Sequence, residues 1–508
     1  MVHVDNEEGI PHYWGKTGKG LQKLITIVAT TDFLLFGYDQ GVMSGIISAP
    51  AFTEDFPQVL DETYEGFVVS IYAVGCFLGA LFILNFGDRL GRRNSIFLGA
   101  IIMIIGVVVQ IAAVPPAVVP RPNSSSAEQS PVSETAECSE SHNRGKLICI
   151  EGGNVAIGTL IAYWIDYGCT YGPHAFVWRF PIAFQVVFAS IVLVMMMKLP
   201  ESPRWLLTHN RHYPCWSQRY SPQLPEVMAQ IETIEKAIAA TGNKGGKTPF
   251  SALFTGGKTQ HFRRLILGAS SQMMQQLSGC NAVIYYFPIL FQKSIGTDHN
   301  MALLLGGVNM IIYSIFATTS WFAVERVGRR KLFLIGTVGQ CASMILTFGA
   351  LIPAAVGLFT YIAFFGATWL PLPWLYPAEI NPLKTRAKAN ATSTVSNWLW
   401  NFFIVMITPV MIHGTGTYGW GTYAFFAAMN AIFFPIIYFF YPETSGRSLE
   451  EIDLIFAKGY TEKISYVTAA KQLPRMADHE VADKAREYGF GSDDEKAEAS
   501  ERENGVVV

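Results

Sequence analysis

Long apolar runs without charged residues determine most of what this chain can fold into. Eleven such runs recur along its 508 residues, while only 15% of the residues are charged and these gather in the connections and tails. Soluble domains carry about 25% charged residues, and about 20 apolar residues in a helix span the hydrocarbon core of a bilayer. The sequence therefore predicts an all-α polytopic membrane protein, with the lipid bilayer as a partner.

The charges of the connections predict how the chain crosses the membrane. The expected spans are 22–47, 66–86, 95–114, 149–168, 177–198, 263–290, 301–323, 331–352, 356–378, 390–412 and 420–441. Lys and Arg gather in 87–93, 144–146, 199–264, 325–331 and 384–388, and are absent from 48–65, 169–176, 353–355 and 413–419. Because basic loops stay in the cytoplasm, we expect both termini and the long central connection to be cytoplasmic. No retrieval signal is visible, which favours the plasma membrane.

Two cytoplasmic termini require an even number of spans, and the missing one can be located. Only one apolar run lies between the basic stretches 87–93 and 144–146, and residues 110–135 are rich in Pro and Ser and include Arg121 and Glu128. Prolines and charges at the bilayer centre are too costly for a spanning helix. The fourth helix is therefore degenerate or missing. We hypothesise a local change of reading frame or a miscalled exon junction; the alternative is a genuine divergent loop with a re-entrant third span.

The chain also contains two copies of one unit. Gly91 of Gly-Asp-Arg-Leu-Gly-Arg-Arg has its counterpart in Gly328, 237 residues later, again between basic residues. The segment Glu137 to Arg144 recurs as Glu379 to Arg386, 242 residues later, and Pro-Glu-Ser at 200–202 recurs as Pro-Glu-Thr at 442–444. Repeats of this length between apolar segments are typical of membrane transporters.

The repeats and the charge pattern divide the chain into five parts. We expect a cytoplasmic N-terminal segment at 1–21, a first transmembrane bundle at 22–198, a cytoplasmic central connection with short helices at 199–262, a second bundle at 263–441 and a charged cytoplasmic tail at 442–508.

Several motifs together resemble one transporter family. GYDQG (37–41), GDRLGRR (87–93), PESPRW (200–205), QQLSGCNAVIYY (275–286), PWLYPAEI (373–380) and YPETSGRSLEEID (441–453) are similar to the motifs of the sugar porter family of the major facilitator superfamily. Within this family, the motifs are most similar to those of fungal members that resemble the yeast glycerol–proton symporter. The resemblance covers nearly the whole chain apart from about 110–135 and 212–225. It implies two six-helix bundles, related by pseudo-symmetry, that rock about a central site.

Charged side chains at the ends of the spans are expected to form a cytoplasmic gate. They are Asp88, Arg89, Arg92, Arg93, Glu137, Arg144, Glu325, Arg329, Glu379 and Arg386. Charges at helix ends can clamp two bundles together when the opposite side is open. The alternative is that they only mark topology by positive charge.

Polar side chains in the sixth apolar run, 263–290, are the first candidates for a solute site. Gln275 and Gln276 lie near Asn281 and Tyr285 on one face of a helix, and intramembrane amides are costly unless they meet other helices or a polar ligand. The resemblance adds Trp374 and Asn397. It also shows two departures from a hexose site: Gly152 holds the usual Gln position of the fifth family helix, and Tyr313 holds the usual Asn position of the eighth. These changes suit a smaller polyol such as glycerol about as well as a sugar. The alternative role of the amides is hydrogen bonding between helices.

Asp39 is the candidate for proton coupling, because an ionised carboxylate inside a span is expensive and proton exchange would link it to the gradient. Asp32 lies one heptad earlier on nearly the same face. Related symporters pair this Asp with an Arg on the fourth helix, which is the helix missing here. The alternative is a structural Asp that neighbouring donors satisfy.

Together these features predict a secondary active transporter that imports a small polyhydroxylated solute with protons. An uncoupled facilitator, a transporter-like nutrient sensor and an inactive product of a faulty gene model remain as alternatives. No nucleophile–base pair, metal cluster or phosphate loop is visible, so we expect no enzyme activity and no cofactor. The net charge of −2 gives no indication of nucleic-acid binding.

Overall fold

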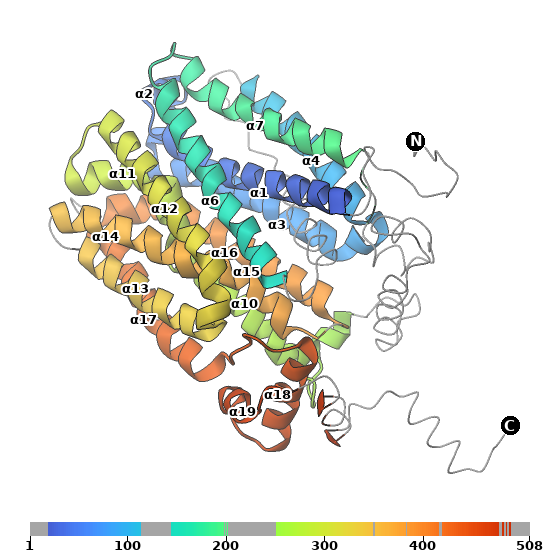
Figure 1. Cartoon of the computed structure of the whole chain (residues 1–508). Helices are drawn as coiled ribbons and strands as arrows, with labels where there is room; N and C mark the ends of the chain where they lie inside the picture. Colours follow the sequence, from blue (N-terminus) through green and yellow to red (C-terminus); the bar gives the residue numbers. More distant parts are fainter. Residues whose placement is uncertain are drawn as a thin grey trace, which may run out of the picture.

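The computed structural model of the chain describes residues 19–112, 144–197, 250–348, 351–382, 384–415 and 419–476, with single positions just beyond them, and the account below is restricted to these. All regular structure in these residues is helical. Long helices run alongside one another in one bundle, and α18 (Leu449–Thr461) and α19 (Tyr466–Gln472) lie against one end of it (Figure 1). The predicted all-α fold is confirmed.

The described helices fall into two halves along the chain. The first half contains α1 (Lys19–Ile47), α2 (Pro50–Asp55), η1 (Pro57–Leu60), α3 (Glu62–Leu90), α4 (Arg92–Ile111), α6 (Arg144–Cys169) and α7 (Phe176–Met196). A short helix, η3 (Phe250–Phe254), precedes the second half. That half contains α10 (His261–Leu277), α11 (Cys280–Ile295), α12 (His299–Val327), α13 (Arg329–Thr347), α14 (Leu351–Phe364), the π-helical η4 (Phe365–Trp369), α15 (Leu372–Ile380), α16 (Arg386–Gly414) and α17 (Trp420–Phe440).

The two halves pack in the same way. Helix α4 packs on α7 as α13 packs on α17, and α1 packs on α6 as α10 packs on α16. Between the halves, α3 packs on α16 and α6 packs on α12, and these two contacts are also counterparts. The repeat found in the sequence is therefore a repeat of structure, and the halves meet along two equivalent helix pairs.

Each of the eleven apolar runs lies in helical structure, but two runs are broken. Seven of the described helical segments are long and apolar enough to cross a membrane by themselves. The run 263–290 is divided between α10 and α11, which have 17 and 16 residues, and the run 356–378 is divided among α14, η4 and α15. Breaks in spanning helices are typical of transporters, where they bring backbone groups to a buried site.

The anomalous segment 110–135 falls almost wholly outside the described residues, as do 212–225 and Glu137; α4 ends at Ile111. Two sequence expectations differ from the structure, one between the first two spans and one in the tail. The loop 48–65 contains α2 and η1, and α3 already begins at Glu62. The tail, expected only to be charged, forms α18 with a capping box between Ser448 and Glu451.

A row of glycines explains how closely α1 approaches α6. Gly37, Gly41 and Gly45 recur every fourth residue and therefore lie on one face of α1. A Cβ atom at Gly37 would lie 1.9 Å from the carbonyl oxygen of Val155 on α6, and the Thr159 hydroxyl donates to the Gly37 carbonyl at 3.0 Å. Small residues at this spacing let spanning helices touch backbone to backbone.

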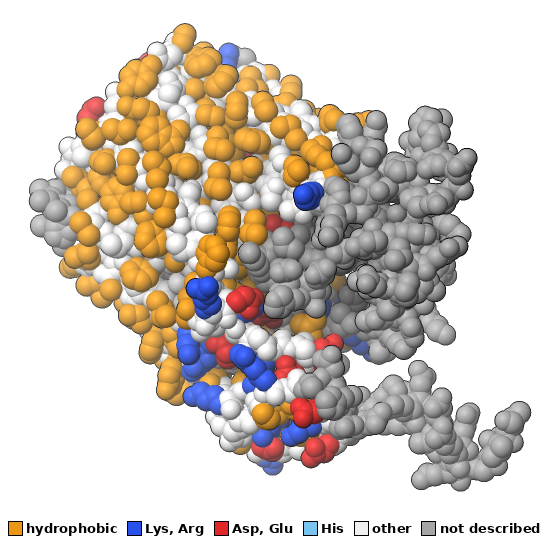
Figure 2. Space-filling view, in the orientation of Figure 1, with side chains coloured by type: hydrophobic (Ala, Val, Ile, Leu, Met, Phe, Trp, Pro, Cys, Tyr) orange, Lys and Arg blue, Asp and Glu red, His pale blue; other side chains and the backbone are white. Residues whose placement is uncertain are grey.

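The outer surface separates by polarity. On the face drawn in Figure 2, hydrophobic side chains cover the bundle, whereas Lys, Arg, Asp and Glu gather at the end that carries α18 and α19. We call this the basic end, because it includes the turns at Gly91 and Gly328 and the Arg residues that follow them. The opposite end, which includes Glu54, Asp55 and Asp61 between α1 and α3, is the acidic end.

Candidate functional site

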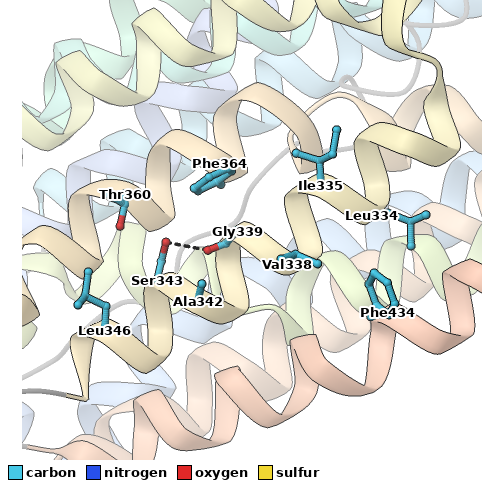
Figure 3. A pocket seen from close by; sticks show the side chains of 10 residues that line it. All are labelled: Leu334, Ile335, Val338, Gly339, Ala342, Ser343, Leu346, Thr360, Phe364 and Phe434. Atoms are coloured by element: carbon cyan, nitrogen blue, oxygen red, sulfur yellow. Dashed lines mark hydrogen bonds between the residues drawn. The ribbon is translucent and has the colours of Figure 1, made fainter.

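Two hollows are candidates for a solute site, and the larger one is unsuitable. It is a groove of about 660 Å³ between α13, α14 and α17 (Figure 3). Its only polar side chains are Ser343 and Thr360, and each donates back to a carbonyl of its own helix, Gly339 at 2.8 Å and Val356 at 2.8 Å. A hydroxylated solute would therefore find no available hydrogen-bond donor among the side chains that line this groove. The groove opens on the apolar outer surface.

The second hollow is an enclosed cavity of about 50 Å³ between the two halves. Helices α1 and α6 of the first half and α10, α11, α12, α15 and α16 of the second contribute to its wall. The wall consists of Phe33, Phe36, Gln40, Glu151, Gly152, Val155, Gln275, Gln276, Cys280, Asn281, Ile284, Tyr313, Phe365, Leu370, Pro371, Trp374 and Asn397. Six of the seven predicted solute-binding residues are among them.

The break between α10 and α11 brings two of these amides together. Gly279 adopts a φ of 101°, a conformation that glycine tolerates best, and a Cβ atom there would lie 2.8 Å from the ring of Phe426. The turn places Asn281, at the start of α11, beside Gln276 at the end of α10, and the Asn281 amide donates to Gln276 Oε1 at 2.6 Å. A discontinuous helix thus gives a paired amide at the cavity wall.

Prolines in the α14–α15 segment explain the hydrogen bonds of two further glutamines. In a helix, the carbonyls of Trp369 and Pro373 would accept from the N–H four residues later, but those positions are Pro373 and Pro377, which have none. Gln275 Nε2 donates to the Trp369 carbonyl at 2.8 Å, and Gln272 Nε2 donates to the Pro373 carbonyl at 2.8 Å. Each glutamine therefore satisfies a carbonyl that a proline leaves without a donor.

The same two glutamines orient Asn397 on α16. The Asn397 amide donates to Gln272 Oε1 at 2.5 Å and to Gln275 Oε1 at 3.0 Å. Gln272 does not line the cavity, and we did not predict it; it lies one turn before Gln275 and Gln276, on the same face of α10. Gln272 therefore links the Asn397 side chain on α16 to the backbone of α15.

Aromatic side chains complete the wall, and one of them has an unused hydroxyl. Tyr313 is 1% exposed, and its hydroxyl has no hydrogen-bond partner among the described residues. A buried hydroxyl without a partner is costly, so the position suits a ligand that brings one. On the opposite side Gly152 leaves room, since a Cβ atom there would approach nothing nearer than Pro371 at 3.8 Å. Trp374 adds a half-buried indole.

The seventh predicted solute residue, Tyr285, is buried but does not line the cavity. Tyr286 beside it donates to the Val405 carbonyl of α16 at 3.1 Å, and its own φ and ψ of −112° and 17° kink α11. Sequence reasoning treated 263–290 as one regular helix. The break at Gly279 lies between Gln276 and Tyr285 and changes the angular phase, so spacing alone does not place Tyr285.

Asp39 lies in the middle of α1, buried, outside the cavity wall. The cavity face of α1 carries Phe33, Phe36 and Gln40, and the adjoining face carries the glycines against α6. Asp32, one heptad earlier, is also buried, and its Oδ2 atom has no hydrogen-bond partner among the described residues. The two carboxylates thus lie within α1's buried surface, near the cavity but not in its wall.

The predicted gate residues of the second half form a tight network at the basic end. Arg329 Nη2 lies 2.7 Å from Glu379 Oε1 and 2.8 Å from Glu325 Oε1. The carboxylate of Glu443 accepts from the backbone N–H of Arg329 at 2.8 Å, and the hydroxyl of Thr444 donates to Glu379 at 2.6 Å. The network joins α12, α13, α15 and the segment after α17, all of which belong to the second half.

The first half repeats part of this arrangement. Glu201 accepts from the backbone N–H of Arg93 at 3.1 Å, as Glu443 accepts from that of Arg330 at 3.2 Å. The side chain of Arg93 donates to the Met197 carbonyl at the end of α7, and that of Arg330 donates to the Tyr438 carbonyl near the end of α17. Both arginines therefore tie the start of one helix to the end of another.

The structure describes fewer contacts for the remaining gate residues. Arg89 is exposed, and the side chains of Asp88, Arg92 and Arg144 lie outside the described set, together with Glu137. Arg386 donates through Nε to the Asn381 carbonyl at 3.1 Å, while Glu379 contacts Arg329. Among the described residues, the ion pairs of the network lie within one half rather than between halves.

The halves are joined by other contacts near the cavity. The Tyr163 hydroxyl on α6 donates to the Ile284 carbonyl on α11 at 2.5 Å, and the Ser314 hydroxyl on α12 donates to the Ala156 carbonyl on α6 at 3.1 Å. Both bonds cross from one half to the other at positions of α6 that follow its wall residues Glu151, Gly152 and Val155. On that side the cavity is closed by contacts that a relative movement of the halves would break.

Comparison with known proteins agrees with this architecture. The family model "Sugar (and other) transporter" matches residues 24–118 and 130–456, and the gap between them falls inside the anomalous segment 110–135. Sugar transporter STL1 of Saccharomyces cerevisiae is 42% identical over 96% of this chain and 90% of its own length. The major facilitator superfamily transporter mfsA of Aspergillus fumigatus is 39% identical over 94% of each chain. The solved structure of the proton:xylose symporter XylE bound to 6-bromo-6-deoxy-D-glucose superposes with a TM-score of 0.74 and 25% identity, and covers 86% of this chain and 100% of its own.

Proposed function

The chain belongs to the sugar porter family of the major facilitator superfamily, and on that premise we propose that it imports a small polyhydroxylated solute, a sugar or a polyol, by proton symport with alternating access. Its relatives are transporters, and it is a transporter rather than an enzyme. The solute would bind in the enclosed cavity between the halves.

The observation that carries the proposal is the chemistry of the cavity wall. Gln276 and Asn281 present paired amides, Tyr313 presents a hydroxyl without a protein partner, and Trp374 presents an aromatic surface. Amides both donate and accept, which suits vicinal hydroxyls, and an aromatic face suits the C–H side of the same molecule. Because both halves supply wall residues, a bound solute would sense their relative position.

The size of the wall residues favours a small solute. Tyr313 fills the position at which the family usually has Asn, and the enclosed space is about 50 Å³. Gly152, on the other side of the cavity from Tyr313, leaves more space than the usual Gln would. It also lacks the amide that hexose-binding members use at this position. We therefore favour a short polyol such as glycerol over a hexose, in agreement with the resemblance to fungal glycerol–proton symporters.

Proton coupling is proposed through Asp39, whose buried carboxylate lies on the helix that also contributes Phe36 and Gln40 to the wall. Support comes from the similarity to the structure of the proton:xylose symporter XylE. We further propose that the basic end faces the cytoplasm, with both termini there, in the plasma membrane. An uncoupled facilitator is the second candidate, because Asp39 itself does not line the cavity.

Uptake of labelled glycerol and glucose by cells that express the full chain, with simultaneous recording of external pH, tests the proposal. Symport predicts saturable uptake accompanied by external alkalinisation, and Asp39→Asn should abolish the alkalinisation. Uptake without alkalinisation would establish the facilitator instead. No uptake of either solute by protein present at the cell surface would contradict the proposal.

A further inference from the structure

The groove between α13, α14 and α17 has no role in the proposed function, although it is larger than the solute cavity. Seven of the ten residues that line it belong to α13, which forms its floor. Figure 3 shows Thr360 and Phe364 of α14 on one side of these residues and Phe434 of α17 on the other. Its volume of about 660 Å³ is within the range of about 300–1,000 Å³ that is typical of hollows that hold small molecules.

Two small residues, Gly339 and Ala342, give the floor of the groove its depth. A Cβ atom at Gly339 would lie 2.3 Å from the ring of Phe364, so the glycine also lets the wall lie close to the floor. The offset of 237 residues between the two copies places Ile102 and Ile105 of α4 at the equivalent positions, and both are exposed. Branched side chains of that size would fill the floor. The small residues therefore belong to the second half alone and do not follow from the repeat.

The length and depth of the groove match one leaflet of a bilayer. The rise along α13 from Leu334 to Leu346 is about 18 Å, and half of the hydrocarbon core of a bilayer is about 15 Å thick. Because α13 begins at Arg329, the groove starts about 8 Å from the basic end. Its side chains offer no available hydrogen-bond donor, so an extended apolar chain is the kind of group that fits it.

Two cations lie at the mouth of the groove, where it approaches the basic end. Lys331 is exposed and lies four residues before Ile335, on the same face of α13 as the floor. Its flexible side chain can extend to the level of the lipid headgroups. The Arg330 guanidinium lies over the ring of Tyr438 at 5.1 Å, and that ring stacks on Phe434 of the wall with the ring centroids 6.2 Å apart. The wall of the groove therefore leads to a guanidinium group, and its floor leads to an ammonium group.

The carboxylates near this mouth are those of the gate network. Arg329 pairs with two of them, and the third accepts from backbone N–H groups at the start of α13. Among the described residues, none of these carboxylates forms an ion pair with Lys331 or with the side chain of Arg330. The mouth therefore presents positive charge to an anion at the membrane surface.

A second copy of the chain suits this surface less well than a lipid does. Two copies related by a twofold axis along the membrane normal would place Lys331 and Arg330 of one copy at the same depth as those of the other, so that like charges would face each other. A phospholipid, by contrast, brings an apolar chain for the groove and a phosphate for the mouth.

We propose that the groove and its mouth bind an anionic phospholipid of the leaflet at the basic end, with one acyl chain between α13, α14 and α17 and the phosphate at Lys331 and Arg330. Basic pockets between spanning helices bind anionic headgroups, and each Lys or Arg near the membrane surface favours an anionic lipid about fivefold. This site is on the outer surface of the second half, separate from the solute cavity. It therefore depends neither on which solute is carried nor on proton coupling.

Photolabelling of the full-length protein in nanodiscs tests the site. The nanodiscs contain a phosphatidylserine or a phosphatidylcholine with the same diazirine-bearing acyl chain at equal mole fraction, and labelled residues are identified by peptide mass spectrometry. We expect the phosphatidylserine to label residues 334–346 at least fivefold more than the phosphatidylcholine does. Lys331→Gln should lower this preference at least threefold, whereas Lys331→Arg, which keeps the charge, should retain it.

Filling the groove tests the position of the acyl chain. Ala342→Phe should lower the labelling of residues 334–346 by either lipid at least fivefold, because the new ring occupies the floor. Ile105→Phe is the matched control, since Ile105 is the exposed counterpart of Ala342 on α4, and it should leave this labelling unchanged.

Each other outcome would overturn the inference. Equal labelling of the wild-type groove by the two lipids would mean that bulk lipid fills it, and undiminished labelling in Ala342→Phe would mean that no chain lies on the floor. If Ala342→Phe is not monodisperse, Val338→Trp, which fills the groove from a position that is already 53% exposed, must show the loss of labelling instead. A groove protected from both lipids, together with cross-linking of two copies through Val338→Cys, would identify an interface between copies of the chain.

Discussion

Gln272 gives the sharpest test of how prolines and glutamines cooperate around the solute cavity. Replacing it by Leu keeps the volume nearly constant but removes two hydrogen bonds: the one to the Pro373 carbonyl at 2.8 Å and the one to Asn397 at 2.5 Å. A buried carbonyl left without a donor costs about 1–3 kcal/mol, and a lost hydrogen bond costs about 1 kcal/mol. Asn397 still bonds Gln275. We therefore expect Gln272→Leu to lower stability by about 2–4 kcal/mol.

A second substitution should partly restore the stability that Gln272→Leu removes. Pro377 lies inside α15, four residues after Pro373, and Pro377→Ala restores the N–H that a helix would use to satisfy the Pro373 carbonyl. The cost of Gln272→Leu should therefore be smaller by about 1–2 kcal/mol in the Pro377→Ala background than in the wild-type background. Such a coupling is expected only where two groups serve the same partner.

Thermal unfolding of the purified protein in detergent measures this cycle. If the second half unfolds as a unit, each kcal/mol shifts the midpoint by about 2–4 °C, so Gln272→Leu should lower it by about 4–16 °C. Gln292→Leu is a control, since Gln292 is a partly buried glutamine near the end of α11. Equal effects of Gln272→Leu in both backgrounds would refute the assignment of the Pro373 carbonyl to Gln272.

Three further predictions follow from single contacts. Gly41→Leu should prevent folding, because a Cβ atom at Gly41 would lie 2.8 Å from Ala162. Gly168→Leu is the control, since the space around Gly168 is open, and it should leave the yield of monodisperse protein unchanged. Equal yields of the two variants would contradict the close approach of α1 and α6. Arg329→Ala should remove the cation paired with Glu379 and leave it only the Thr444 hydroxyl, and should favour opening at the basic end. This opening would be seen as at least threefold faster labelling of a cysteine placed there, and an unchanged rate would count against the gate. Asp453→Asn should free the tail from the fully buried Arg264 and raise its protease sensitivity severalfold, whereas exposed Glu450→Gln should not; equal digestion would exclude this contact as a latch.

The sequence predicted the spans well because the bilayer allows few alternatives. A spanning segment must satisfy its own backbone hydrogen bonds, so apolar runs of the right length become helices. The pairing of the halves was also visible in the sequence, because Gly91 and Gly328 occupy equivalent turns with φ of 82° and 95° beside Glu201 and Glu443. Both features depend on local sequence and composition.

The site was only partly predictable. Gln275, Gln276 and Asn281 stand out because amides are expensive in a membrane, and Trp374 and Asn397 came from the resemblance to the family. Gln272 was missed because its role depends on the Pro373 carbonyl, about 100 residues away, which a proline leaves without a donor. Only the fold brings the two together. Tyr285 was placed by helical spacing across the break at Gly279, where such spacing does not apply.

The contact of α6 with the second half shows a further limit. The sequence analysis noted Gly152 for the amide that it lacks, while the close approach at Gly152 and Gly153 offered no pattern. The halves meet there, and that contact joins α6 to residues about 170 and 220 positions later. Interfaces between repeats cannot be derived from the composition of either repeat.

Cys280, a native thiol in the cavity wall, provides the most direct measurement of the central claim that a hydroxylated solute binds between the halves. Full-length protein in proteoliposomes is treated with a membrane-permeant maleimide during solute exchange, and labelling of each cysteine is followed by peptide mass spectrometry. The account predicts that saturating glycerol or glucose, whichever is transported, slows the labelling of Cys280 at least fivefold but leaves that of Cys341 unchanged, since Cys341 lies outside the cavity wall. Labelling of Cys280 at the same rate with and without a transported solute would contradict it.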